Sequence, residues 1–119
     1  MIYHDEVTVQ FQVPFDPRQF DDFGQELFDT VDETVPAEVF PLGTEVVVRD
    51  TIVSSRYRMI LAPTVDIPPG IGDGLRLGWN AFVIDPEDSA TGLRVDGTVE
   101  RHMLRGRLHH YELITKSVE

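Results

Sequence analysis

The chain has 119 residues, enough for one domain, since domains of about 100–150 residues are the commonest. Its 21 Asp and Glu residues outnumber its 10 Lys and Arg residues, and the net charge of −11 excludes a protein that wraps nucleic-acid phosphates with a basic surface. It contains no cysteine, which excludes disulfides, thiolate nucleophiles and cysteine-based metal centres.

A half-buried strand is predicted over Glu6–Val13, where apolar and polar residues alternate strictly. Successive side chains of a strand point to opposite faces, so this alternation places the apolar residues on one buried face. The apolar residues are Val7, Val9, Phe11 and Val13.

The acidic segment Asp16–Glu33 is compatible with either a short helix or a long acidic hairpin loop. Asp16-Pro17 favours an end to the first strand, because proline cannot donate to a sheet ladder, and the pair also suits the start of a helix. Gly24 interrupts an apolar pattern with helical spacing. The apolar residues of that pattern are Phe20, Phe23, Leu27 and Val31. Seven acids against Arg18 alone lead us to expect an exposed, projecting segment.

Beyond Pro36 the pattern predicts short strands, rich in Val, Ile, Tyr or Thr and bounded by turn residues. They are Ala37–Leu42, Glu45–Val53, Arg56–Ala62, Leu75–Ile84, Gly92–Glu100 and Arg107–Ser117. Their spacing of roughly 8–12 residues, without helical patterns long enough for crossovers, predicts a mainly β fold. We expect a single domain over residues 1–119, a small antiparallel β-barrel or sandwich with long loops and at most one short helix.

Within Glu45–Val53, the three apolar residues Val46, Val47 and Val48 are consecutive. Alternation fails there, so both faces of the segment are expected to be covered. Either the fold itself covers them, or a neighbouring subunit does.

No residue pattern in the chain predicts catalysis. The serines lie in no nucleophile-elbow context, and no cysteine replaces them. The glycine-rich stretch Gly70–Gly74 lacks the lysine and the helix start that phosphate-binding loops need. We therefore expect no enzyme activity, no catalytic residue and no cofactor.

Three of the four histidines, His102, His109 and His110, lie near Glu100 and Glu112 on what are predicted to be two adjacent strands. Because His109 and His110 are consecutive, a regular strand would point them to opposite faces, where they cannot chelate one ion together. We therefore expect a hairpin with surface imidazoles and no metal site.

Several stretches share a pattern with one known family. Val35–Glu45 is an apolar strand followed by a Pro-Leu-Gly-Thr loop, and Met59–Pro69 is an apolar strand that leads through Asp66 to a Pro-Pro-Gly turn. After Val95–His102, a glycine precedes a His-His strand that ends in an acid, Gly106–Glu112. In these stretches, which are spread over about two thirds of the chain, it resembles the head-to-tail stopper (head-closure) proteins of long-tailed bacteriophages.

The resemblance implies a small β-barrel that assembles into a ring beneath the portal and adaptor, closes the DNA channel after packaging and receives the tail. The implied location is the virion neck, and the host cytoplasm during assembly. The implied partners are further copies in a homo-oligomeric ring, the adaptor or portal proteins, the tail terminator, and packaged DNA in the lumen without sequence recognition. The charge of −11 agrees with this, because a lumen through which DNA slides should not bind phosphate.

An acidic N-terminus and the lack of an apolar run of about 18 residues lead us to expect neither a signal peptide nor a membrane partner. A competing hypothesis is a small acidic β-barrel binding module of a salt-adapted cell, in which the acid excess serves hydration and solubility.

Two candidate sites follow. By the resemblance, the channel gate matches Gly43–Ser55, while the alternative for this stretch is an ordinary buried strand of the barrel. The candidate gate and intersubunit residues are Gly43, Thr44, Glu45, Val46, Val47, Val48, Arg49 and Asp50. The acidic segment is expected to dock on a neighbouring ring or to line the channel, and its alternative is a solvated helix face. Its candidate interface residues are Asp16, Phe20, Asp21, Asp22, Phe23, Glu26 and Asp29.

Overall fold

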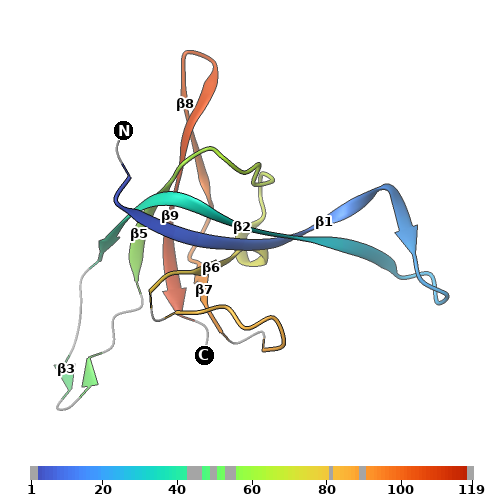
Figure 1. Cartoon of the computed structure of the whole chain (residues 1–119), viewed down its shortest axis with the longest axis horizontal. Helices are drawn as coiled ribbons and strands as arrows, with labels where there is room; N and C mark the ends of the chain where they lie inside the picture. Colours follow the sequence, from blue (N-terminus) through green and yellow to red (C-terminus); the bar gives the residue numbers. More distant parts are fainter. Residues whose placement is uncertain are drawn as a thin grey trace.

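The computed structural model describes residues 3–42, 47–48, 51–52, 56–80, 82–88 and 91–117. These residues form strands and one short 3-10 helix (Figure 1). The elements are β1 (Asp5–Phe20), β2 (Glu26–Pro41), β3 (Val47–Val48), β4 (Thr51–Ile52), β5 (Tyr57–Leu61), η1 (Gly72–Gly74), β6 (Arg76–Gly78), β7 (Leu93–Val95), β8 (Glu100–Leu104) and β9 (Arg107–Ser117). Within these ranges, no helix is long and apolar enough to cross a membrane.

Six antiparallel strands close into a barrel in the order β5-β2-β1-β6-β7-β9. The barrel closes where β5 pairs with β9, from Leu61↔Tyr111 to Arg58↔Ile114. β8 is an additional strand that pairs with β9. Closure satisfies backbone groups that an open sheet would leave unpaired at its edges. The predicted mainly β, antiparallel fold is confirmed, and of the two predicted forms, barrel and sandwich, the chain adopts the barrel.

The barrel interior is filled by alternate residues of its strands. On β1, Val7, Val9 and Phe11 are buried, and the half-buried Val13 packs against the same core, as the alternation predicts. Tyr111 of β9 has no exposed surface. The other members of the buried apolar core are Val35, Ala37, Met59, Leu61, Ala62, Ile67, Leu75, Leu77, Leu93, Val95 and Leu113. Each buried Val, Leu, Ile, Phe or Met side chain contributes about 1.5–3 kcal/mol when it leaves water, so the barrel is the stable unit of the chain.

The helix option for the acidic segment is wrong, because this segment is the distal part of a long β-hairpin. β1 passes through Pro17 and ends at Phe20, which pairs with Glu26 of β2. The described residues contain no α-helix. In the hairpin, the backbone groups of both long strands form hydrogen bonds with each other. These bonds outweigh the weak local preference for a helix. Gly24 lies in the connecting turn with a φ of +81°, a conformation that glycine adopts without strain.

The later strands differ from prediction mainly in length. The predicted strand Arg107–Ser117 is confirmed as β9, and β5 lies inside the predicted Arg56–Ala62. The predicted Leu75–Ile84 is too long, because β6 ends at Gly78 and the chain then reverses in a backbone-paired turn. The predicted Gly92–Glu100 combines β7 with the first residue of β8, and turn residues separate the two strands.

Candidate functional site

The arm, residues 12–30, is the part of the β1–β2 hairpin that extends beyond the barrel (Figure 1). Its side chains are exposed or half-buried. Inside the barrel, by contrast, the same two strands carry fully buried residues at alternate positions. The chain measures 52 × 40 × 21 Å, and its radius of gyration of 15.9 Å exceeds the value of about 13.5 Å expected for a compact domain of this length. The arm therefore presents surface that contributes little to the core of its own chain.

Hydrogen bonds define the conformation of the arm's tip. The Asp21 carboxylate accepts hydrogen bonds from the backbone N–H groups of Phe23 and Gln25, at 2.8 and 2.9 Å. Behind the turn, the Arg18 guanidinium forms a two-point ion pair with Glu26 across the hairpin. The Arg18 hydrogen bond lowers the pKa of the Glu26 carboxyl. The tip is thus held by its own contacts and not by the barrel.

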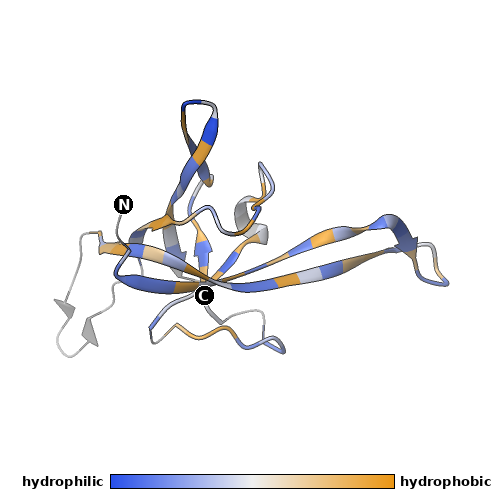
Figure 2. Cartoon of the chain, turned by 45° about the horizontal axis from the view of Figure 1, so that its top comes forward, coloured by the Kyte–Doolittle hydropathy of each residue, from blue (hydrophilic) through white to orange (hydrophobic). Residues whose placement is uncertain are grey.

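Apolar side chains on the arm remain in contact with solvent. Phe23 in the turn is 90% exposed, and Phe20 beside it is 56% exposed. Leu27 and Phe28 on β2 are also exposed. Figure 2 shows apolar stretches alternating with hydrophilic ones along the arm. Exposed aromatic residues on an element with defined geometry are typical of a protein–protein contact.

The arm carries all seven candidate interface residues predicted from the sequence. Asp21 and Glu26 are half-buried, because the turn and Arg18 cover them. The other five are exposed: Asp16, Phe20, Asp22, Phe23 and Asp29. The segment projects from the barrel, and its contact with a neighbouring ring stays a prediction.

The candidate gate residues are only partly described. Gly43, Thr44, Glu45, Val46, Arg49 and Asp50 lie outside the described residues. Val47 and Val48 form β3, which pairs with β4 in a two-stranded sheet separate from the seven-stranded one. The prediction of one strand over Glu45–Val53 is therefore wrong for the described residues, and β3 is not among the strands that close the barrel. The gate role itself stays a prediction.

β8 and β9 form a hairpin that carries three of the four histidines. The hairpin turns at Arg105 and Gly106, whose φ values of 55° and 78° are those of a type I′ turn. A bulge then shifts the register by one residue, so that His102 faces His110. His109 is the extra residue on β9, and bulges of this kind re-aim side chains.

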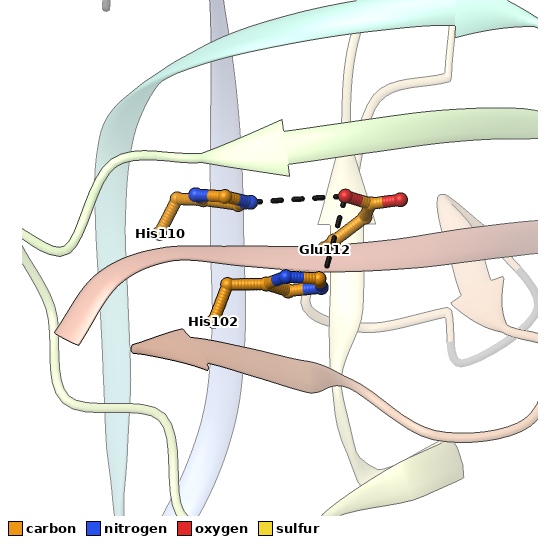
Figure 3. A group of neighbouring side chains, drawn as sticks. All are labelled: His102, His110 and Glu112. Atoms are coloured by element: carbon orange, nitrogen blue, oxygen red, sulfur yellow. Dashed lines mark ion pairs between the residues drawn. The ribbon is translucent and has the colours of Figure 1, made fainter. Parts of the chain in front are cut away.

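The histidine cluster consists of His102, His110 and Glu112. Figure 3 shows the two imidazole rings one above the other, with their centroids 4.6 Å apart and their planes 11° from parallel. Glu112 Oε1 lies 3.8 Å from Nε2 of His102 and 3.7 Å from Nε2 of His110. Glu100 Oε1 lies 2.9 Å from Nε2 of His102. Because Tyr111 points into the barrel, its neighbours on β9 place this cluster on the outer face.

Two further residues contact the cluster. Arg58 of β5 donates from Nε to Glu112 Oε2 at 2.9 Å. The Nδ1 atoms of His109 and His110 lie 2.8 Å apart, so the expectation that these two rings point to opposite faces is wrong. The bulge brings both rings to one side of the sheet. Burial and the neighbouring imidazoles of His102 and His109 lower the pKa of His110, against an opposing effect of Glu112.

Inside the barrel, Tyr111 fastens the loop that follows β5. Its hydroxyl donates a hydrogen bond to the carbonyl oxygen of Val65 and accepts one from the backbone N–H of Ile67, both at 3.0 Å. Arg101, which faces Tyr111 across the ladder, donates to the carbonyl oxygen of Ile67 at 2.7 Å. These contacts support the fold and present no reactive group to solvent.

Comparison of the chain with protein-family models finds no match, and comparison with curated proteins finds none either. The fold and surface together define a small antiparallel β-barrel domain with a projecting hairpin arm and a histidine-bearing second hairpin.

Proposed function

We propose that this chain is a non-enzymatic, ring-forming component of the neck of a long-tailed bacteriophage virion, of the head-to-tail stopper class. The observation that carries the proposal is the arm. Its tip is hydrogen-bonded into a defined shape around Asp21, yet it leaves Phe20 and Phe23 in solvent. Such a surface becomes stable in water when a neighbouring molecule covers the aromatic rings.

An arm of this kind suits a ring of identical copies. In a cyclic assembly each copy contacts the next through two different surfaces, so an extension on one barrel can lie against the following barrel. Burying Phe20 and Phe23 would supply the apolar centre of that contact, and the acids around them would form its polar rim. The adaptor or portal proteins and the tail terminator would contact the two faces of the ring.

Two other features support a DNA channel through the ring. The net charge of −11 disfavours phosphate binding, which would allow packaged DNA to move without being held. The β3–β4 sheet does not pair with the barrel strands, and in the proposed ring it would form contacts between copies near the axis. Edge strands such as β3 and β4 can pair through main-chain hydrogen bonds with a neighbouring chain.

The test is the presence and oligomeric state of the chain in tailed particles, measured by native mass spectrometry and negative-stain microscopy. We expect rings in the neck. Deletion of Gln19–Thr30 should leave the barrel folded by circular dichroism and block the assembly of tailed particles. Absence of the chain from purified particles, or only monomeric copies within an assembly, would contradict the proposal.

A binding module of a salt-adapted cell is the second candidate, because exposed acids on the arm are typical of surfaces that retain hydration at high salt. Such a module would also be non-enzymatic. The two candidates differ in their need for salt: the module should stay folded only at molar salt, whereas the neck protein should stay folded without it.

A further inference from the structure

We propose that His102, His110 and Glu112 bind one divalent transition-metal ion, with Zn²⁺ as the ion that fits best. The site is independent of the neck role, because its three ligands all lie on the β8–β9 hairpin and none of them belongs to the arm or to β3. It lies on the outer face of the barrel, where an ion can enter from solvent.

The donor atoms lie close together. One ring nitrogen of each histidine and a Glu112 oxygen lie within 4.8 Å of one another, and Glu112 Oε1 is 3.8 Å from Nε2 of His102 and 3.7 Å from Nε2 of His110. Zinc bonds of about 2.0–2.2 Å in a tetrahedral arrangement place ligand atoms about 3.3–3.6 Å apart. Because the two rings are stacked and nearly parallel, each imidazole has to turn about its Cβ–Cγ bond to direct its lone pair at a shared ion, and Nε2 of His102 has to give up its hydrogen bond with Glu100.

Two positioning residues prepare the donors. Arg58 occupies Glu112 Oε2 and leaves Oε1 directed at the two rings. His109 can accept the Nδ1 proton of His110, since those two atoms lie 2.8 Å apart, and this tautomer leaves the lone pair of His110 Nε2 free for a metal. Contacts of this kind from surrounding residues orient ligands in known metal sites.

The donor set selects the kind of metal. Two imidazoles and a carboxylate suit zinc and its transition-metal neighbours, whereas Mg²⁺ and Ca²⁺ prefer oxygen ligands only. Three protein ligands leave a fourth position for water or for the carboxylate of Glu100, which lies beside His102. Because His102 is on β8 and the other two ligands are on β9, a bound ion would cross-link the hairpin.

The test is isothermal titration of the tag-free, EDTA-treated chain with ZnCl₂. We expect saturable binding of one ion per chain, and no binding of MgCl₂ under the same conditions. His102→Gln and Glu112→Gln should each raise the Kd at least about 100-fold, and His109→Phe should raise it about 10-fold. His4→Gln is the matched control, because His4 pairs with Glu38 away from the cluster, and its Kd should be unchanged.

Titration with CoCl₂ gives a second readout, because a tetrahedral site should produce visible absorption that His102→Gln removes. Circular dichroism of every variant checks that the barrel is folded. The proposal fails if the unmodified chain shows no one-to-one binding, if His102→Gln binds as the unmodified chain does, or if His4→Gln loses binding.

Discussion

The hydroxyl of Tyr111 donates a hydrogen bond to the carbonyl oxygen of Val65, 3.0 Å away and 46 residues earlier in the chain. The same hydroxyl accepts a hydrogen bond from the backbone N–H of Ile67. Tyr111 therefore joins the closing strand of the barrel to the loop after β5, and one buried side chain connects two parts of the fold.

Tyr111→Phe removes this connection and leaves the ring in place. The backbone groups of Val65 and Ile67 lose a partner, and we expect a loss of about 1–3 kcal/mol in the free energy of unfolding. Urea denaturation measures it. Tyr3→Phe, which changes a half-buried tyrosine elsewhere, is the control, and an equal loss in both variants would contradict the structural role of the Tyr111 hydroxyl.

Val47→Asp tests the position of β3 outside the barrel. We expect this variant to stay folded, because β3 pairs with β4 and not with the barrel strands. Val9→Asp is the matched comparison, since Val9 is fully buried, and an unpaired carboxylate there should cost more than about 4 kcal/mol and unfold the chain. Thermal denaturation followed by circular dichroism distinguishes the two.

In assembled particles, Val47→Asp should also release packaged DNA if β3 and its neighbours act as a gate. A nuclease-protection assay on purified particles measures that release. If the isolated Val47→Asp protein is unfolded, the segment belongs to the core and the gate hypothesis loses its support.

Phe23→Ser tests the arm as a contact surface. Phe23 is almost fully exposed, so the substitution should leave the free energy of unfolding unchanged while weakening the contact between copies at least about tenfold. Val83→Ser, at an exposed apolar residue away from the arm, should leave assembly unchanged. Sedimentation velocity of both variants gives the result, and equal assembly would argue against the arm as the interface.

The lowered pKa of His110 predicts a dependence of stability on pH in the metal-free chain. Burial and the imidazoles of His102 and His109 disfavour the protonated form in the folded state, so the unfolded chain binds a proton at higher pH than the folded chain. The stability that neutral His110 contributes is fully present above the ordinary imidazole pKa of about 6.5. It is lost as the pH falls towards the lower pKa that His110 has in the folded chain. Urea denaturation with EDTA present measures the free energy of unfolding at two pH values. The difference between the two values should be smaller for His110→Gln than for the unmodified chain.

Salt separates the two candidate functions. A neck protein from an ordinary host should remain folded at about 0.15 M salt, because its barrel core does not depend on charge screening. A module from a salt-adapted cell should unfold below molar salt, where the acids repel one another. Circular dichroism across a dilution series from 3 M salt, roughly the range relevant to such cells, decides between them.

Much of the barrel could be predicted from local sequence. Whether a strand residue faces inward depends on a two-residue period, so Val7, Val9 and Phe11 were assigned correctly without knowledge of their partners. The arm could not be assigned in this way. Its residues are compatible with both a short helix and a hairpin. The pairing of β1 with β2 decides between these two structures.

The sequence by itself determined the mainly β, antiparallel class, the absence of thiol chemistry and the acid excess, because these depend on composition and on the short-range period of side chains. The tertiary structure alone decided where the histidines lie. A regular hairpin around the turn would set His102 opposite His109, but the bulge sets it opposite His110. Pairing of β9 with the distant strand β5 turns Tyr111 inward, and so places His110 and Glu112 together on the outer face.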